Sequence, residues 1–243
     1  MYRYEMHLHT CGCSACGAST AKEMVDAAKE HGYAGIVFTN HFFRGNTRID
    51  RNLPWKDFVA AYEKDWQDVR DYAAQMDIDV LFGIEECYRA GREVLIYGVE
   101  PAVIAAEERF PTFTREELSD FVRENGGFIA VAHPFRIRNY IPDPDVVEPS
   151  ECFDAVEIYN AGDPADRNIK AWKYCKTSGL LPTSGGDVHR GETMGKAGLA
   201  FSERIRDSRA LVEHLKNGEY SLIINGEIVS IENCMENFEQ IVE

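Results

Sequence analysis

The chain has 243 residues, of which 44% are hydrophobic and 28% charged; this composition belongs to a folded domain and excludes a disordered, collagen-like or coiled-coil chain. Lysine and arginine number 26 against 41 acidic residues, so the net charge is −15. A field of that sign repels nucleic-acid backbones and anionic membranes, so we expect neither a polynucleotide nor a membrane as the partner.

Short apolar runs alternate with amphipathic segments along the chain. Capping boxes at Thr20–Glu23 and Thr114–Glu117 predict the starts of two helices. In chain order, the predicted elements are a first strand ending at 7–9, a helix over 20–31, a strand over 34–39, a helix over 55–76, strands over 79–84 and 93–98, a helix over 114–125, strands over 128–132 and 155–159, a helix over 165–178, a strand over 180–184, a helix over 208–217 and a strand over 220–224. Residues 232–243 are acidic and poorly patterned, and form either a terminal helix or a tail.

Apolar strands that alternate with helices predict a parallel sheet covered by helices, within one α/β domain over residues 1–243. Six or seven such units without a G-x-G-x-x-G turn favour a barrel. An open doubly wound sheet is the alternative.

Five of the seven histidines lie just past the C-terminal ends of predicted strands. They are His7, His9, His41, His133 and His189, and Glu85 ends a strand in the same way. Loops at that end of parallel strands converge on one mouth. His7-Leu8-His9 and Asp187-Val188-His189 each place two side chains on one face, because strand side chains alternate. Imidazoles with carboxylates suit zinc, manganese or iron better than calcium, so the sequence predicts a metal centre at this mouth.

The motifs that contain these residues resemble those of a known family. In order, they are His7-Leu8-His9-Thr10, Thr39-Asn40-His41, Gly83-Ile84-Glu85, Ala132-His133-Pro134 and Gly186-Asp187-Val188-His189. Over roughly residues 1–200 the chain is similar to the PHP (polymerase and histidinol phosphatase) family of metal-dependent phosphoesterases. The resemblance implies a distorted seven-stranded (β/α)7 TIM-like barrel as a single domain. Residues 201–243 then form the last helix–strand unit and an acidic C-terminal segment.

The resemblance also implies a site and an activity. Carried over by position, the ligands of two or three divalent ions (zinc, manganese or iron) would be His7, His9, His41, Glu85, His133, Asp187 and His189, with Glu85 bridging two ions. The reaction would be hydrolysis of a phosphate ester by a metal-activated hydroxide, held in place by His7, His9, Glu85 and Asp187. Four arginines follow these motifs and are candidates for binding the phosphate oxygens: Arg44, Arg136, Arg138 and Arg190.

Two positions depart from the family pattern. Where the first motif of the family continues to an aspartate, this chain reads Cys11-Gly12-Cys13-Ser14-Ala15-Cys16, with Cys16 near the place of that aspartate. A thiolate can bind zinc or iron, so Cys16 is either a further ligand or a small buried thiol, and Cys11 and Cys13 are weaker candidates. Leu95 stands where many members carry a histidine, so the ion shared by Glu85 and His133 is expected to lack a ligand, which favours two ions.

The predicted substrate is a small phosphorylated molecule, either a phosphomonoester of the histidinol phosphate type or a nucleotide. A nuclease or oligonucleotide phosphodiesterase of the same fold is one alternative, and a degenerate domain that binds metal without catalysis is another. A metal-dependent amidohydrolase fits less well, since no predicted strand end offers a lysine that could be carboxylated to bridge metals. The sequence leaves the native metal and the oligomeric state open.

The expected location is the cytoplasm. No window approaches eighteen uncharged apolar residues, and the first residues lack the apolar core of a signal peptide. The seven cysteines are therefore expected to be reduced thiols rather than a disulfide framework.

Overall fold

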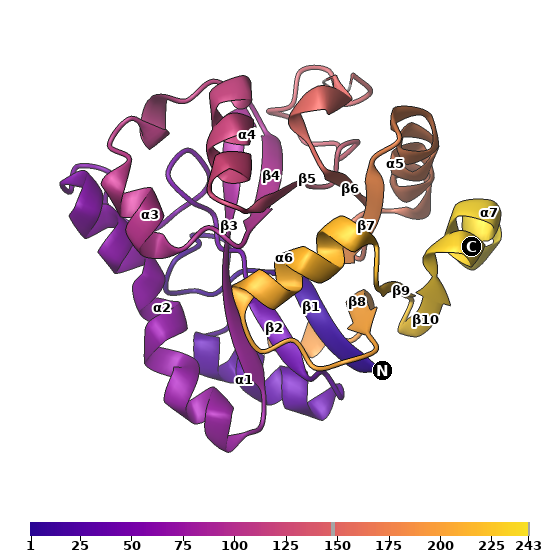
Figure 1. The fold of residues 1–243 in the computed structure, drawn as a ribbon, viewed down its shortest axis with the longest axis horizontal. Coiled ribbons are helices and arrows are strands. Elements are labelled where there is room, and N and C mark those ends of the chain that lie inside the picture. The colour runs from indigo at the N-terminus through magenta and orange to yellow at the C-terminus, as the bar shows by residue number, and fades with distance from the viewer. Residues whose placement is uncertain (147–148, 243) are drawn as a thin grey trace.

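A computed structural model describes residues 1–146 and 149–242, and its strands form one ten-stranded sheet in the order β10-β9-β8-β1-β2-β3-β4-β5-β6-β7. The strands of this described part are β1 (Tyr2–Leu8), β2 (Gly35–Phe38), β3 (Asp79–Arg89), β4 (Arg92–Tyr97), β5 (Phe128–Val131), β6 (Ala155–Asn160), β7 (Leu181–Gly185), β8 (Ala197–Phe201), β9 (Ser221–Ile224) and β10 (Glu227–Ser230). The sheet curls, so that its edge strand β7 lies against the far part of the sheet (Figure 1). The Ser184 hydroxyl of β7 donates to the Ile223 carbonyl of β9 at 2.7 Å, and Val188, just after β7, pairs with Leu8 of β1.

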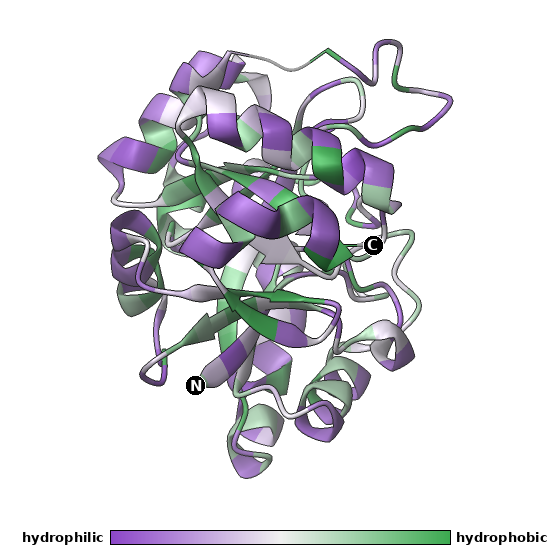
Figure 2. Cartoon of the chain, turned by 90° about the vertical axis from the view of Figure 1, so that its right-hand side faces the viewer, coloured by the Kyte–Doolittle hydropathy of each residue, from purple (hydrophilic) through white to green (hydrophobic). Residues whose placement is uncertain are grey.

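Helices surround this curled sheet. They are α1 (Ala21–Glu30), α2 (Trp55–Gln75), α3 (Pro101–Ala106), α4 (Arg115–Glu124), α5 (Ala165–Ser178), α6 (Ser208–Asn217) and α7 (Ile231–Val242), with short 3-10 turns η1 (Phe110–Thr112), η2 (Ser150–Cys152) and η3 (Gly191–Thr193). Both predicted capping boxes are confirmed, at the starts of α1 and α4. Figure 2 shows that apolar residues concentrate in the strands, whereas the helices alternate apolar and polar residues. Among the described residues, no helix is both long and apolar enough to cross a membrane.

The α/β class is confirmed, but the expectation of an all-parallel sheet is wrong. Parallel pairing joins β1 to β2, β2 to β3, β5 to β6 and β6 to β7, whereas β4 runs antiparallel to both β3 and β5. Only Ala90 and Gly91 separate β3 from β4, and a parallel crossover needs a dozen or more residues. Strands β8, β9 and β10 add further antiparallel pairs, so a regular sevenfold strand–helix alternation does not describe this sheet.

The last part of the chain was incompletely predicted. Strands β8 and β10 were not expected, and residues 231–242 form the terminal helix rather than a tail.

Helix α6 covers one end of the curled sheet and crosses in front of the strands in Figure 1. Its Leu211 and Leu215 side chains are fully buried, and Lys216 donates to the Gly126 carbonyl just before β5. That is the amino-terminal end of a parallel strand. The predicted metal ligands lie at the opposite, carboxyl-terminal end, which α6 leaves open.

Candidate metal centre

His7 and His9 stand at the carboxyl end of β1, and both side chains are fully buried. Strand alternation puts the two imidazoles on one side of the chain, with ring centroids 5.1 Å apart. Val188 fixes this end of β1, since its N–H donates to the His7 carbonyl at 3.0 Å and its carbonyl accepts from the His9 N–H at 2.8 Å. The two predicted motifs, 7–9 and 187–189, therefore lie side by side.

Glu85 of β3 is a fully buried carboxylate on which four imidazoles converge. Its Oε1 lies 3.0 Å from Nε2 of His133 and 3.2 Å from Nε2 of His7. Its Oε2 lies 2.7 Å from Nδ1 of His41 and 3.5 Å from Nε2 of His9. Each oxygen thus faces two ring nitrogens, as a carboxylate shared between two metal positions would.

Asp187 is the second carboxylate of the cluster, and its two oxygens have different partners. Oδ1 lies 3.1 Å from Nε2 of His9 and 3.5 Å from Nε2 of His7. Oδ2 pairs at 2.6 Å with Arg136, whose Nε pairs with Asp163 at 2.8 Å. Burial alone would raise the pKa of Asp187, but the charges of Arg136 and His7 outweigh it and hold that pKa well below its ordinary range. The Asp187 carboxylate therefore remains ionised, and its Oδ1 is directed at the histidines.

Hydrogen bonds to the outer ring nitrogens select the metal-facing nitrogens of His7 and His189. Nδ1 of His7 lies 3.0 Å from the Glu157 carboxylate, which only accepts, so this nitrogen carries a proton. Nδ1 of His189 donates to the Asp187 carbonyl at 2.8 Å. In both rings Nε2 is left as the nitrogen for a metal.

Ser14 performs the same task for His9. The Ser14 hydroxyl donates to Oδ1 of Asn40 at 2.9 Å, so towards Nδ1 of His9, 3.1 Å away, it acts as an acceptor. It also accepts from the backbone N–H of His41 at 3.0 Å. One hydroxyl therefore orients His9 and anchors the neighbouring His41, with Nε2 of His9 facing the centre.

The charges of the cluster move the histidine pKa values in opposite directions. Burial would lower the pKa of His7 and of His41, but the carboxylates, led by Glu157 for His7 and Glu85 for His41, raise both well above the ordinary value. Burial and the charge of His41 lower the pKa of His9 to about 3. Because metal ions compete with protons for these nitrogens, ion binding releases protons from the cluster.

The residues present fit divalent metal ions. Nε2 of His7, Nε2 of His9, Nδ1 of His41 and Oε2 of Glu85 are buried and lie close to one another without forming a hydrogen bond. Such atoms are costly to bury unless they bind something. Within the described chain, ligand atoms no more than 4.8 Å apart form the groups His9–His41–His189, His7–His9–Glu85, His7–His133–Asp187 and His41–Glu85–Glu93. Mixed nitrogen and oxygen donors of this kind suit zinc, manganese and iron.

Two cluster residues, each the second residue after the end of a strand, have strained backbone. His133 and Asp187 have φ values of 29° and 49°, a region that costs a non-glycine residue about 1–3 kcal/mol. Close approach is also needed nearby, since a Cβ at Gly185 would lie 2.4 Å from Oε1 of Glu157. Local backbone strain thus accompanies the orientation of the His133 and Asp187 side chains towards the centre.

Glu93 of β4 joins the cluster although the sequence pattern did not predict it. Its Oε1 lies 3.4 Å from Nδ1 of His41, and its Oε2 lies 3.6 Å from Nε2 of His133. Leu95 pairs directly opposite Glu85, and Glu93, two residues earlier, shares its face of the strand. The carboxylate of Glu93 thus lies near the place where Leu95 leaves an imidazole lacking. The signal for it in the sequence was its spacing of two residues from Leu95.

Glu157 of β6 is the second residue that sequence reasoning missed. Besides Nδ1 of His7, its carboxylate accepts from the His133 N–H at 3.0 Å and from the Asn160 amide at 2.8 Å. It therefore orients His7 and holds the strained His133 backbone. A carboxylate in the middle of an apolar strand is rarely buried unless paired, and this was the signal.

Glu157→Gln is expected to weaken metal binding about 10–100-fold, as loss of an outer partner of a metal-binding histidine typically does. The amide is neutral and a poorer acceptor for Nδ1 of His7, whose orientation would be lost. Competition of the protein against a chromogenic chelator for zinc measures the affinity. Glu151→Gln, on the exposed turn η2, is the control, and equal affinities in both variants would leave Glu157 a packing role only.

The cysteines of the first loop separate into two environments. Sγ of Cys16 lies 3.1 Å from Nε2 of His189. Burial would raise the pKa of Cys16, but hydrogen bonds with His189 and His41 outweigh it and lower that pKa to about 6. Cys13 is buried, donates to the Tyr62 carbonyl at 3.1 Å and has a pKa raised by burial. Cys16 thus lies beside the cluster, whereas Cys13 points away from it.

A cavity of about 680 Å³ opens beside the cluster and brings together three of the four predicted arginines. Arg44, Arg136 and Arg138 line it together with Tyr140. Arg190 is exposed and is not among its lining residues, so the structure does not place Arg190 with the other three.

The three lining arginines differ in how many ion pairs and hydrogen bonds they already form within the protein. Arg136 is held by the carboxylates of Asp187 and Asp163. Arg44 pairs with the buried Glu86 at 3.2 Å. The Arg138 guanidinium is exposed and donates to the Ile137 carbonyl. Because Arg44 also donates to the Phe113 carbonyl at 2.7 Å, Arg138 is better placed than either Arg44 or Arg136 to meet a ligand in the cavity.

Comparison with known proteins assigns the chain to a family. Residues 5–142 match the model of the PHP domain, and residues 165–220 match a model described as PHP-associated. The chain therefore belongs to the PHP domain family. No curated protein sequence matches it.

Solved structures share the fold at low sequence identity. A two-domain protein from Bacteroides vulgatus ATCC 8482, which contains a predicted PHP-like metal-dependent phosphoesterase, has 16% identity and a TM-score of 0.69 over 99% of this chain and 69% of its own. A proposed metal-dependent phosphoesterase from Bifidobacterium adolescentis ATCC 15703 has 13% identity and a TM-score of 0.56 over 87% and 95% of the two chains. An amidohydrolase from Chromobacterium violaceum, solved with sulfate and without metal, has 15% identity and a TM-score of 0.52 over 77% and 87%.

Proposed function

We propose that this PHP domain protein is a metal-dependent phosphoesterase that hydrolyses a small phosphomonoester, either a nucleotide or a compound of the histidinol phosphate type. One observation carries the proposal: four imidazoles converge on the two oxygens of Glu85 beside a cavity lined by arginines. The predicted phosphoesterases among proteins of the same fold support it.

The proposed cofactors are two or three divalent ions, zinc, manganese or iron. Their ligands would be His7, His9, His41, Glu85, Glu93, His133, Asp187 and His189. When bound, such ions polarise phosphoryl oxygens and lower the pKa of a water to about 7, so that hydroxide can attack phosphorus.

The chain itself would position the ester and complete its charge balance. Arg44 and Arg138 line the cavity. The exposed guanidinium of Arg138 can match two phosphoryl oxygens with two parallel hydrogen bonds, whereas Arg44 adds positive charge to the cavity wall. The negative charges of the Glu85 and Asp187 carboxylates would stabilise the positive charge of the ions beside the buried histidines. Arg136 keeps Asp187 ionised and oriented, so its contribution to hydrolysis is through that carboxylate.

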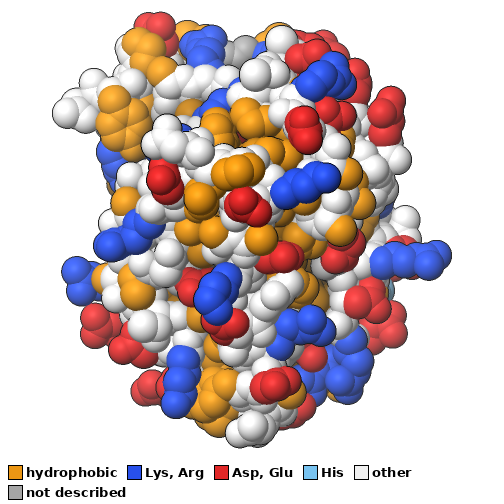
Figure 3. Space-filling view, turned by 90° about the vertical axis from the view of Figure 1, so that its left-hand side faces the viewer, with side chains coloured by type: hydrophobic (Ala, Val, Ile, Leu, Met, Phe, Trp, Pro, Cys, Tyr) orange, Lys and Arg blue, Asp and Glu red, His pale blue; other side chains and the backbone are white. Residues whose placement is uncertain are grey.

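The shape and charge of the molecule favour a small substrate. A cavity of about 680 Å³ falls within the range of about 300–1,000 Å³ typical of small-molecule sites. The net charge is −15, and the face in Figure 3, where α2 and α3 lie, mixes acidic, basic and hydrophobic side chains without a basic stripe. Such a surface offers little to a nucleic-acid backbone. We also propose a cytoplasmic location, because all seven cysteines are free thiols.

An amidohydrolase remains a second candidate because one protein of the same fold carries that description. Its sulfate, however, is a tetrahedral dianion of the shape of phosphate. In this chain a glutamate, Glu85, occupies the position between the histidines, where a carboxylated lysine would bridge the metals of an amidohydrolase. These features favour the phosphoesterase.

Metal analysis and a chelation assay test the proposal together. Protein purified without added metal or chelator is expected to contain two to three equivalents of zinc, manganese or iron per chain. It should hydrolyse p-nitrophenyl phosphate, lose that activity on chelation and regain it when metal is returned.

Parallel assays separate the alternatives. Preference for bis(p-nitrophenyl) phosphate or a short oligonucleotide would point to the phosphodiesterase, and preference for an acyl amide to the amidohydrolase. One equivalent of metal or none, even after incubation with these ions, would favour the degenerate domain and contradict the proposal.

A further inference from the structure

We propose that Cys16 supplies a thiolate to the metal position bounded by His9, His41 and His189, which makes that position a nitrogen–sulfur site for zinc or iron(II). The inference deepens the proposed function, because it concerns the class of metal at one position of the same centre. Experiments can contradict this inference and still confirm the hydrolytic activity.

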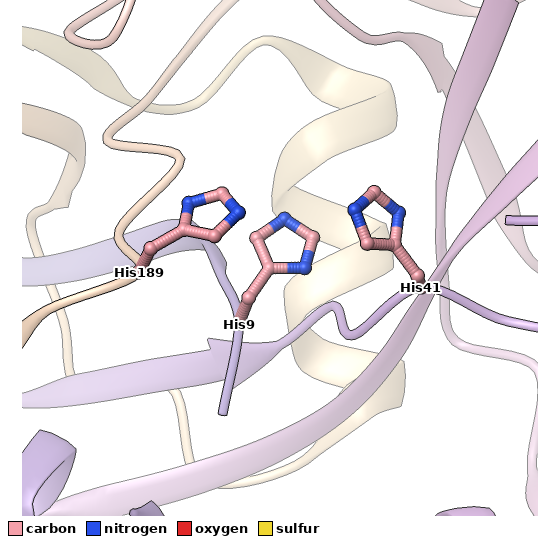
Figure 4. A group of neighbouring side chains, drawn as sticks. All are labelled: His9, His41 and His189. Atoms are coloured by element: carbon pink, nitrogen blue, oxygen red, sulfur yellow. The ribbon is translucent and has the colours of Figure 1, made fainter. Parts of the chain in front are cut away.

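Three imidazoles already define this position. Figure 4 shows His9 between His41 and His189, with ring centroids 4.4 Å and 4.5 Å from theirs. Ligand atoms of the three residues lie within 4.8 Å of one another. Nε2 of His9 is buried and lacks a hydrogen-bond partner. An unpartnered buried nitrogen between two further imidazoles marks a position with three nitrogen donors, one ligand short of a tetrahedral set.

Cys16 places a sulfur atom next to this group. Its Sγ lies 3.1 Å from Nε2 of His189, the nitrogen left for a metal because Nδ1 donates to the Asp187 carbonyl. An ion that binds both atoms would replace the contact between them, and the thiol proton would pass to solvent. Three imidazoles and one thiolate form a soft donor set that favours zinc or iron(II) over magnesium or manganese.

The loop that carries Cys16 is held on both sides by the backbone. The N–H of Ala15 donates to the Asn46 carbonyl at 2.8 Å, and the N–H of Ala18 donates to the His189 carbonyl at 2.9 Å. The second of these bonds ties the loop directly to a residue of the proposed site. Cys16 is therefore placed by the fold and does not depend on a free loop to reach the centre.

Cys87 provides a matched control thiol. It lines the same cavity as Cys16, but its Sγ donates to the Arg89 carbonyl at 2.9 Å. Substitution of Cys87 thus shows the effect of removing any thiol from the cavity, and substitution of Cys16 shows the effect of removing the thiol beside the histidines.

Cobalt(II) is the probe, since a cobalt–thiolate bond gives a charge-transfer band in the near ultraviolet that nitrogen and oxygen ligands do not give. The cobalt-loaded full chain is expected to show this band, Cys87→Ser to retain it, and both Cys16→Ser and Cys16→Asp to lose it. Cys16→Asp guards against a folding defect, because its carboxylate can still hold an ion. A band missing from the parent protein, or one retained in Cys16→Ser, would overturn the proposal.

Alkylation gives an independent readout. Zinc is expected to protect Cys16 from iodoacetamide, as mapped by mass spectrometry, and to leave the labelling of Cys87 unchanged; labelling of Cys16 that zinc does not alter would contradict the thiolate ligand. Hydrolysis of p-nitrophenyl phosphate is measured on the same samples. Hydrolysis without the band would contradict the thiolate ligand but support the phosphoesterase. The band without hydrolysis of any phosphate ester would support the thiolate ligand but contradict the phosphoesterase.

Discussion

Asp187→Ala and His7→Ala are each expected to abolish phosphomonoester turnover and to lower the bound metal, while the fold survives. Both side chains belong to the candidate ligand group His7–His133–Asp187, and Nε2 of His7 lies 3.5 Å from Oδ1 of Asp187. In the proposed reaction the metals contribute several kcal/mol of transition-state stabilisation. At about 1.4 kcal/mol per tenfold change, the loss in kcat should be about a thousandfold or more. Steady-state kinetics with p-nitrophenyl phosphate and elemental analysis of each variant measure the two effects.

A histidine outside the cluster supplies the control. His31 is exposed at the end of α1, so His31→Ala should keep both the activity and the metal content. Circular dichroism should show the same secondary structure in all the variants. If Asp187→Ala and His7→Ala turn over substrate as fast as the parent protein, the assigned centre is wrong.

Arg136→Met should destabilise the protein by about 3–5 kcal/mol, the usual cost of removing one partner from a buried ion pair. Arg136 is 8% exposed and pairs with both Asp187 and Asp163. Methionine fills similar space but leaves two buried carboxylates without their cation. Urea unfolding monitored by fluorescence measures the change in the free energy of unfolding. Because Asp187 also loses its orientation, metal affinity should fall with stability.

The neighbouring arginine of the same cavity provides the comparison. Arg138 is exposed and donates to a backbone carbonyl, so Arg138→Met should change the free energy of unfolding by no more than about 0.5 kcal/mol. It should instead raise KM for the phosphomonoester. Equal stabilities of the two variants would show that the Arg136 pairs contribute nothing net.

Local sequence signals were sufficient for most elements of the fold. Capping boxes and apolar periodicity act within a few residues, so the helices α1 and α4 and most strands were predicted near their observed bounds. The directions of the strands were not predicted correctly, because they depend on the length of the segment that connects one strand to the next. The predicted strand ended at Ile84, whereas β3 continues to Arg89 and turns straight into β4, and that extension makes the pairing antiparallel. β8, with the sequence Ala-Gly-Leu-Ala-Phe, is too short to show a period.

The candidate centre was predictable where its residues end strands that share one edge. The structure brings His7, His9, Glu85, His133 and Asp187 together as expected. Glu93 and Glu157 reach the same place from within strands, and their positions depend on which residue pairs across from them. That register comes from tertiary pairing rather than from sequence spacing, so both carboxylates were missed.

The long-range pairing of β1 also determines when the centre can form. The Tyr4 hydroxyl bonds to Ile205, 201 residues away, and the Glu5 carboxylate accepts from the Gly186 N–H, 181 residues away. Contacts so distant in sequence form slowly, because a large loop must close before they stabilise anything. During synthesis His7 and His9 leave the ribosome long before Asp187 and His189 exist. The complete candidate centre is therefore a late product of folding, and its full set of proposed ligands is available to an ion only after the nascent chain has passed residue 189.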